Sequence, residues 1–193
     1  FQTMTTARFE AYLKQDLFDG DEAKYAELQV NTWIHEPGLP SNSPQPKSAR
    51  FDQVDAQIRA FAEGTPARKL ETDGWTTNEW QRFLDNLPQP LSTKQLADLD
   101  HTFHFEHMNA VVQRSWFPND IEAGYQPAYP ALEAFLTSIG RRYLLRPVYM
   151  NPPETPEGLA FARRVYMLAP PGYHSLTQQG IDIVLKWDEV AVE

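Results

Sequence analysis

Histidine and carboxylate side chains that could bind a metal ion gather in the segment DHTFHFEHMN, residues 100–109. His101, His104 and His107 follow one another at spacings of three, which would bring them roughly onto one side of a helix, with Glu106 among them. Zinc accepts such ligands, but the HExxH motif requires histidines four residues apart, and HxxEH is absent too. The spacing therefore favours polar residues on a helix surface, and a small zinc enzyme built on this cluster is the alternative.

Arginines form the one basic cluster of the sequence. Arg141, Arg142 and Arg146 lie within the six residues after Gly140. In one interpretation they are positive charges at the C-terminal end of the preceding helix, where they interact favourably with the helix dipole and form ion pairs. In the other, they form a fork beside a cleft and bind a carboxylate through two parallel hydrogen bonds. The residues by themselves leave both interpretations open.

Other reaction types find no support in the residues. The sequence has no cysteine, no GxSxG motif and no glycine-rich phosphate loop. These absences exclude thiol nucleophiles and thiolate zinc sites, and they argue against the serine nucleophile of the α/β-hydrolases and against phosphate-loop enzymes.

The charge balance restricts the partners. Against 26 acidic residues the chain has 17 lysines and arginines, a net charge of −9, and no basic run. Such a chain repels phosphate backbones and anionic headgroups, so nucleic acid and membrane surfaces are excluded as partners. The sequence contains no stretch of about 20 apolar residues, the length that is needed to span a bilayer. We expect a cytoplasmic location, with export as the alternative that the sequence leaves open.

The elements that must position these side chains are helices. Apolar residues recur at three/four spacing, and no run alternates long enough to build a sheet. We expect nine helices, over about 5–17, 21–36, 51–63, 77–87, 92–103, 108–116, 130–139, 155–166 and 175–187. The predicted helix starts are Thr77, a capping box of Ser92 with Gln95, Thr155, and Ser175 with Gln178. The predicted helix ends include Pro118 and Gly140. Short proline- or glycine-marked turns join them, which predicts an all-α fold of stacked antiparallel pairs, an irregular α-α superhelix of the HEAT or armadillo kind. The five tryptophans, at 33, 75, 80, 116 and 187, are predicted core anchors.

A proline-rich stretch marks the predicted domain boundary. Four prolines fall within ten residues in the segment PGLPSNSPQP, and serine and asparagine lie between them. This composition is typical of an extended linker. We therefore expect residues 1–36 to be the end of one domain, residues 37–48 to be a tether, and residues 49–193 to be the body of another.

Three segments together resemble the C-terminal part of the leukotriene-A(4) hydrolase and aminopeptidase family of zinc metallopeptidases. The first is TMTTARFEAYLKQDLF with WIHEPGLPSNSPQP, and the second is STKQLADLDHTFHF with NAVVQRSW. The third is GRRYLLRPVY followed by ARRVYMLAPPGYHSLTQQGIDIVL. Each motif is weak alone, but their ordered combination covers nearly the whole chain.

The resemblance implies a division of labour between domains. Residues 1–36 would be the last two helices of a thermolysin-like catalytic domain, and residues 49–193 the C-terminal α-helical domain that closes the active-site cleft. The zinc ligands and the general base would lie upstream, so zinc would be the cofactor of the complete enzyme. This chain alone would hold no cofactor and be inactive. Its implied partners are the upstream catalytic domain and a peptide substrate.

The resemblance carries over one functional residue. Arg141 in GRRYLLRP matches the family arginine that binds the substrate carboxylate. Two positions on, the epoxide-hydrolysing members have a lysine that helps to bind this carboxylate. Here that position is Tyr143, which is the second candidate substrate-binding residue. This difference argues against epoxide hydrolysis and for an aminopeptidase. A free-standing helical scaffold that binds proteins is the alternative from another functional class.

Overall fold

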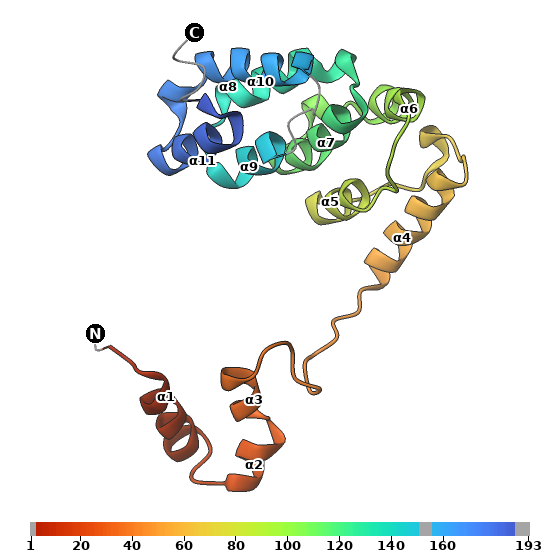
Figure 1. Ribbon diagram of the computed structural model, residues 1–193. Helices are drawn as coiled ribbons and strands as arrows, with labels where there is room; N and C mark the ends of the chain where they lie inside the picture. The colour runs from red at the N-terminus through yellow and green to blue at the C-terminus, as the bar shows by residue number, and fades with distance from the viewer. Residues whose placement is uncertain (1–2, 151–155, 188–193) are drawn as a thin grey trace. The chain divides into compact units, whose positions relative to one another are not determined.

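The computed structural model describes residues 3–150 and 156–187 (Figure 1). The chain divides into two compact units, Phe1–Lys47 and Ser48–Glu193. Within the described residues every regular element is a helix and none is a strand, so the predicted all-α fold class is confirmed. None of these helices is long and apolar enough to cross a bilayer.

Residues 3–47, the described part of the first unit, form three short α-helices and one π-helix. They are α1 (Thr6–Tyr12), the π-helix η1 (Leu13–Leu17), α2 (Glu22–Glu27) and α3 (Val30–His35). The single helix predicted over 21–36 is wrong, because Gln29 has a φ of 52° and separates α2 from α3. Of the described residues up to 47, Val30 and Pro40 alone are buried, so this unit has almost no core of its own.

The second unit consists of helices stacked in pairs. Its α-helices are α4 (Ala49–Ala62), α5 (Thr77–Asp85), α6 (Thr93–Phe103), α7 (Ala110–Ala123), α8 (Tyr129–Ser138), α9 (Arg142–Met150), α10 (Pro156–Leu168) and α11 (Ser175–Leu185). Short 3-10 turns lie between them, namely η2 (Ala67–Lys69), η3 (Phe105–His107), η4 (Gln126–Ala128) and η5 (Pro170–Gly172). Helix α5 packs against α7, α7 against α9, and α9 against α11, while α8 packs against α10 (Figure 1). The predicted stacking of helix pairs is therefore present.

Helix starts follow local side-chain chemistry. The capping box predicted at Ser92 and Gln95 is confirmed, because the backbone N–H of Gln95 donates to Ser92 Oγ at 3.3 Å and that of Ser92 donates to Gln95 Oε1 at 3.0 Å. The cap of α5 is Thr76, one residue before the predicted Thr77.

Of the caps predicted for the last two helices, only that of α11 can be compared with the structure. Helix α11 is capped by His174, whose Nδ1 accepts from a backbone N–H of the first turn at 3.2 Å, so the box predicted at Ser175 and Gln178 is wrong. The cap predicted at Thr155 lies outside the described residues.

Helix α7 runs through the proline that was expected to end it. Pro118 lies inside α7, and the helix ends at Gly124, whose φ is 65°. A proline in a helix interior costs about 3 kcal/mol. Trp116, Phe117 and Ile121 of this helix are all buried, and burying side chains of this size contributes roughly 1.5–3 kcal/mol each. The packing of the helix therefore outweighs the break that the proline favours.

Aromatic side chains fill the core of the second unit. Trp116 stacks on Phe105 with the ring centroids 4.5 Å apart, and both are buried. Trp75 and Trp80 pack against this core, their ring centroids 4.9 Å apart. The predicted anchor role is wrong for Trp33, which lies in the first unit and is 44% exposed.

Candidate functional site

The arginine cluster lies at the beginning of a helix that the periodicity analysis missed. Helix α9 starts at Arg142, and the backbone oxygen of Arg141 accepts from Leu144 N–H at 2.9 Å and from Leu145 N–H at 3.2 Å. The interpretation of these arginines as charges at the C-terminal end of the preceding helix is therefore wrong. The N-terminal end of a helix carries partial positive charge, so cations there are unfavourable unless an anion joins them. The signal for this helix was the apolar spacing of its buried face.

Arg141 shares an aromatic ring with a second arginine. Its Cζ lies 5.7 Å from the centroid of the Tyr143 ring, and Arg114 Cζ of α7 lies 4.6 Å from the same centroid. Arg114 Nε also donates to the backbone oxygen of Tyr143 at 3.1 Å. The Arg141 side chain is exposed and makes no ion pair with any described residue. This arrangement offers positive charge to an anion from solvent, held by cation–π contacts.

A close backbone approach fixes the turn before these arginines. A Cβ atom added to Gly140 would lie 2.0 Å from the backbone oxygen of Gly172 in the turn before α11. Only glycine permits this approach. Gly140 therefore joins the start of α9 to the α10–α11 connection, beyond the helix-ending role that the sequence indicated.

Buried tyrosine hydroxyls connect α9 to its neighbouring elements by hydrogen bonds. The hydroxyls of Tyr149 and Tyr173 lie 3.1 Å apart, and Tyr173 Oη donates to the backbone oxygen of Leu136 at 2.6 Å. Burial raises the pKa of Tyr173 to about 12 and also raises the pKa of Tyr149. These groups stay protonated at neutral pH, so they act as fixed donors that join α8, α9 and the η5–α11 turn.

The histidine cluster does not share a helix face. Helix α6 ends at Phe103, and His104 has a φ of 51°, so the predicted alignment of His101, His104 and His107 on one helix is wrong. His104 Nδ1 and His107 Nε2 lie 3.6 and 3.4 Å from Glu106 Oε1, and both histidines are exposed. Among the described residues no three histidine, aspartate or glutamate side chains are grouped so that they could hold a metal ion.

A buried carboxyl group in α7 escaped the sequence analysis. Asp120 is 0% exposed, and neither of its side-chain oxygens has a hydrogen-bond partner. Burial, followed by the nearby charge of Asp100, raises the pKa of Asp120 well above its ordinary value. An aspartate in the apolar run WFPNDI was the available signal.

The sequence model of one protein family, described as leukotriene A4 hydrolase, C-terminal, matches residues 75–185. The match covers more than half of the chain. The chain belongs to this leukotriene A4 hydrolase C-terminal family. The resemblance to the C-terminal part of this family is thereby confirmed, and the second and third of the three sequence segments lie within the matched residues.

The matched region of this leukotriene A4 hydrolase C-terminal domain runs from the turn before α5 to the end of α11. It includes Arg141 and Tyr143 together with Arg114, which neither the motifs nor the resemblance had singled out. Arg114 contacts Tyr143 across 29 residues of sequence, so only the packing of α7 against α9 brings them together.

Proposed function

We propose that this chain is the C-terminal part of a zinc aminopeptidase in which the helical domain closes the active-site cleft. In this proposal Arg141 binds the C-terminal carboxylate of a short peptide, and the chain alone has no peptidase activity. Tyr143 is the second substrate-binding residue of the proposal, and its ring also contacts the Arg141 guanidinium. The exposed Arg141 at the start of α9, in a domain of this family, is the observation that carries the proposal.

The chemistry of the arginine supports this role. A guanidinium is always charged and offers a planar pair of donors that matches a carboxylate. The contact with the Tyr143 ring, itself held by Arg114, restricts where the Arg141 side chain can lie. A positioned charge orients the peptide, and orientation accounts for a large part of catalytic rate.

Exposed apolar side chains indicate that the first unit packs against a further domain. Phe9, Tyr12, Leu17 and Trp33 are each more than 40% exposed, although they are large and apolar. Several large apolar side chains exposed on one small unit are typical of a surface that packs against another domain. We assign residues 1–36 to the end of the catalytic domain and 37–48 to the tether. A free-standing scaffold would leave these apolar side chains in water, whereas a catalytic domain would cover them. This observation therefore favours the aminopeptidase.

Zinc belongs to the upstream domain in this proposal. Residues described here do not fit a zinc site, since they include no suitable group of ligands. In the complete enzyme zinc would polarise the peptide carbonyl and activate water. No step of that chemistry is assigned to residues of this chain.

The test uses the complete enzyme and two tripeptides, one with a free C-terminal carboxylate and one with a C-terminal amide. Arg141→Ala lowers kcat/KM for the free-acid peptide by roughly 10- to 100-fold, since hydrogen bonds to charged groups contribute about 1.5–3 kcal/mol. The same variant leaves kcat/KM for the amide unchanged, because that peptide presents no charge to Arg141.

Arg68→Ala is the matched control, because Arg68 is an exposed arginine in the same unit and forms no ion pair with any described residue. It retains wild-type kinetics on both peptides. Wild-type kinetics in Arg141→Ala, or an equal loss on the acid and the amide, would overturn the assignment of the carboxylate site.

A further inference from the structure

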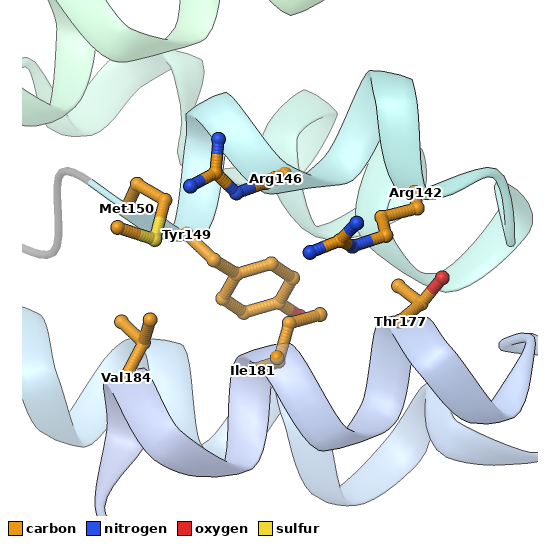
Figure 2. Close-up of a pocket in the computed structure, with 8 residues that line it drawn as sticks. Arg142, Arg146, Tyr149, Met150, Thr177, Ile181 and Val184 are labelled. Atoms are coloured by element: carbon orange, nitrogen blue, oxygen red, sulfur yellow. The ribbon is translucent and has the colours of Figure 1, made fainter. Parts of the chain in front are cut away.

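A second group of arginines lines a cleft on the other side of α9. The cleft lies between α9 and α11 and is partly open to solvent. Arg142 and Arg146 project from α9, and Thr177, Ile181 and Val184 line it from α11 (Figure 2). Arg141 is not among the lining residues, because its side chain lies over Tyr143. We call this space the α9–α11 cleft.

The two arginines of the α9–α11 cleft lack a counter-charge. Arg142 and Arg146 are exposed, and neither has an ion pair or a side-chain hydrogen bond with any described residue. Three other arginines of the same unit each pair with a carboxylate, namely Arg50 with Glu79, Arg82 with Asp55, and Arg164 with Glu133. Other arginines of this unit, such as Arg68 and Arg141, also lack an ion pair with a described residue, but Arg142 and Arg146 line one cleft together, where an external anion could meet both.

A buried hydroxyl lines the cleft at the end where Arg142 lies. Thr177 is 2% exposed, and its Oγ1 has no hydrogen-bond partner. Buried polar atoms without a partner are uncommon and costly, so this hydroxyl would gain from a partner that entered the cleft. Gly180 belongs to the same end, because a Cβ there would lie 4.0 Å from Nε and Nη2 of Arg142. The Arg142 guanidinium therefore lies within van der Waals range of α11 at this glycine.

The rest of the α9–α11 cleft is apolar. Ile181 and Val184 form the wall on α11, and Met150 and the buried Tyr149 close it from α9 (Figure 2). Ligand sites of this composition bind a group that is largely apolar and is oriented by a few polar contacts. A branched aliphatic group suits such a wall, and a carboxylate suits the two guanidiniums.

We propose that the α9–α11 cleft binds a carboxylate that carries a short branched aliphatic group. Arg142 and Arg146 donate to the carboxylate, Thr177 Oγ1 donates to one of its oxygens, and Ile181 and Val184 contact the aliphatic part. This ligand chemistry occurs in a free branched-chain acid and in the C-terminal leucine or valine of a peptide. The proposal goes beyond the aminopeptidase function and does not depend on it.

The experiment titrates the 193-residue chain with isovalerate and follows backbone amide chemical shifts by NMR. Isovaleramide, which has the same shape without the charge, is the matched probe. We expect isovalerate to shift the amides of residues 177–184 in a saturable manner and isovaleramide to bind at least tenfold more weakly, because charged partners strengthen these hydrogen bonds. N-acetyl-leucine distinguishes the sources, since tighter binding than isovalerate indicates a peptide C-terminus and weaker binding indicates a free acid.

Four variants locate the site. Arg142→Gln and Arg146→Gln each weaken isovalerate binding about tenfold or more, as expected when a charged donor is lost. Arg68→Gln, an exposed arginine away from the cleft, and Arg141→Ala leave the binding unchanged. The circular dichroism spectrum and melting midpoint confirm that each variant is folded.

Three results would overturn the proposal. They are the absence of saturable shifts with isovalerate and N-acetyl-leucine, equal binding of isovalerate and isovaleramide, and unchanged binding in folded Arg142→Gln and Arg146→Gln. Loss of binding in Arg141→Ala would also refute a separate site, since the ligand would then occupy the carboxylate site of the proposed function. Peptidase kinetics play no part in this test, so its failure leaves the proposed function intact.

Discussion

Replacing the buried carboxyl group of Asp120 by an amide should stabilise the protein, and more so as pH rises. Asp120 lies on α7 with both oxygens buried and unpartnered, and its pKa is raised well above the ordinary value near 3.8. The native state therefore holds a proton on Asp120 at pH values where the unfolded chain has released it. Stability from this group is fully present below the unfolded pKa and is lost as pH rises toward the native pKa.

The magnitude follows from the burial of this one group. A single proton that the native state binds in excess lowers the free energy of unfolding by about 1.4 kcal/mol per pH unit at most. Asp120→Asn keeps the shape and removes the ionisation, while its amide stays as unpartnered as the carboxyl group. At pH 8 the variant should therefore be more stable than wild type by at least ~1.4 kcal/mol, the contribution of each unit by which the pKa is raised, or roughly 3–6 °C in melting midpoint.

The assay is urea unfolding of both proteins, followed by circular dichroism, from pH 4 to pH 8. Asp55, Glu79 and Glu133 have lowered pKa values and give the opposite slope, and Asp100 has a raised one. The difference between variant and wild type isolates Asp120 from these groups. It should be near zero at pH 4 and grow with pH.

The control for this assay is the exposed Asp85, because Asp85→Asn should give no such trend. Parallel curves for Asp120→Asn and wild type would refute the reasoning.

Two further predictions concern stability. A chain of residues 48–193 should melt within roughly 2 °C of the 193-residue chain, equivalent to ~0.5 kcal/mol, since Val30 and Pro40 are the only buried residues described before residue 48. Calorimetry measures the two melting midpoints. A much larger loss would mean that the first unit stabilises the second. Tyr173→Phe should lower the free energy of unfolding by about 1–3 kcal/mol, because the backbone oxygen of Leu136 loses its buried donor. Urea unfolding checks it against Tyr12→Phe, an exposed tyrosine, and equal stability of the two variants would contradict it.

Much of the fold was predictable because it depends on neighbours in sequence. The spacing of apolar residues predicted most helices, and the hydroxyl and amide of Ser92 and Gln95 predicted the start of α6. Capping and helical periodicity act over three or four residues, so a linear reading contains the necessary information. The ordered motifs also indicated the leukotriene A4 hydrolase family, which the match over residues 75–185 confirms.

Local sequence patterns predicted the wrong structure where packing against distant residues opposed them. Pro118 favours a helix end, yet α7 continues because Trp116, Phe117 and Ile121 are buried against other helices. The left-handed conformation of His104 separated the histidines, although their spacing alone favoured one helix face. Burial energy depends on residues far apart in sequence, so it cannot be summed from a local window.

By itself, the sequence determined the helical class, most of the helix positions, the family and the candidate Arg141. Only the tertiary structure decided the surroundings of that candidate. The packing of α7 on α9 brings Arg114 to Tyr143, and the packing of α9 on α11 leaves Arg142 and Arg146 beside the unpartnered hydroxyl of Thr177. The physical reason is that charge and hydrogen-bond satisfaction are properties of neighbours in space, which the folded chain selects from distant positions in the sequence.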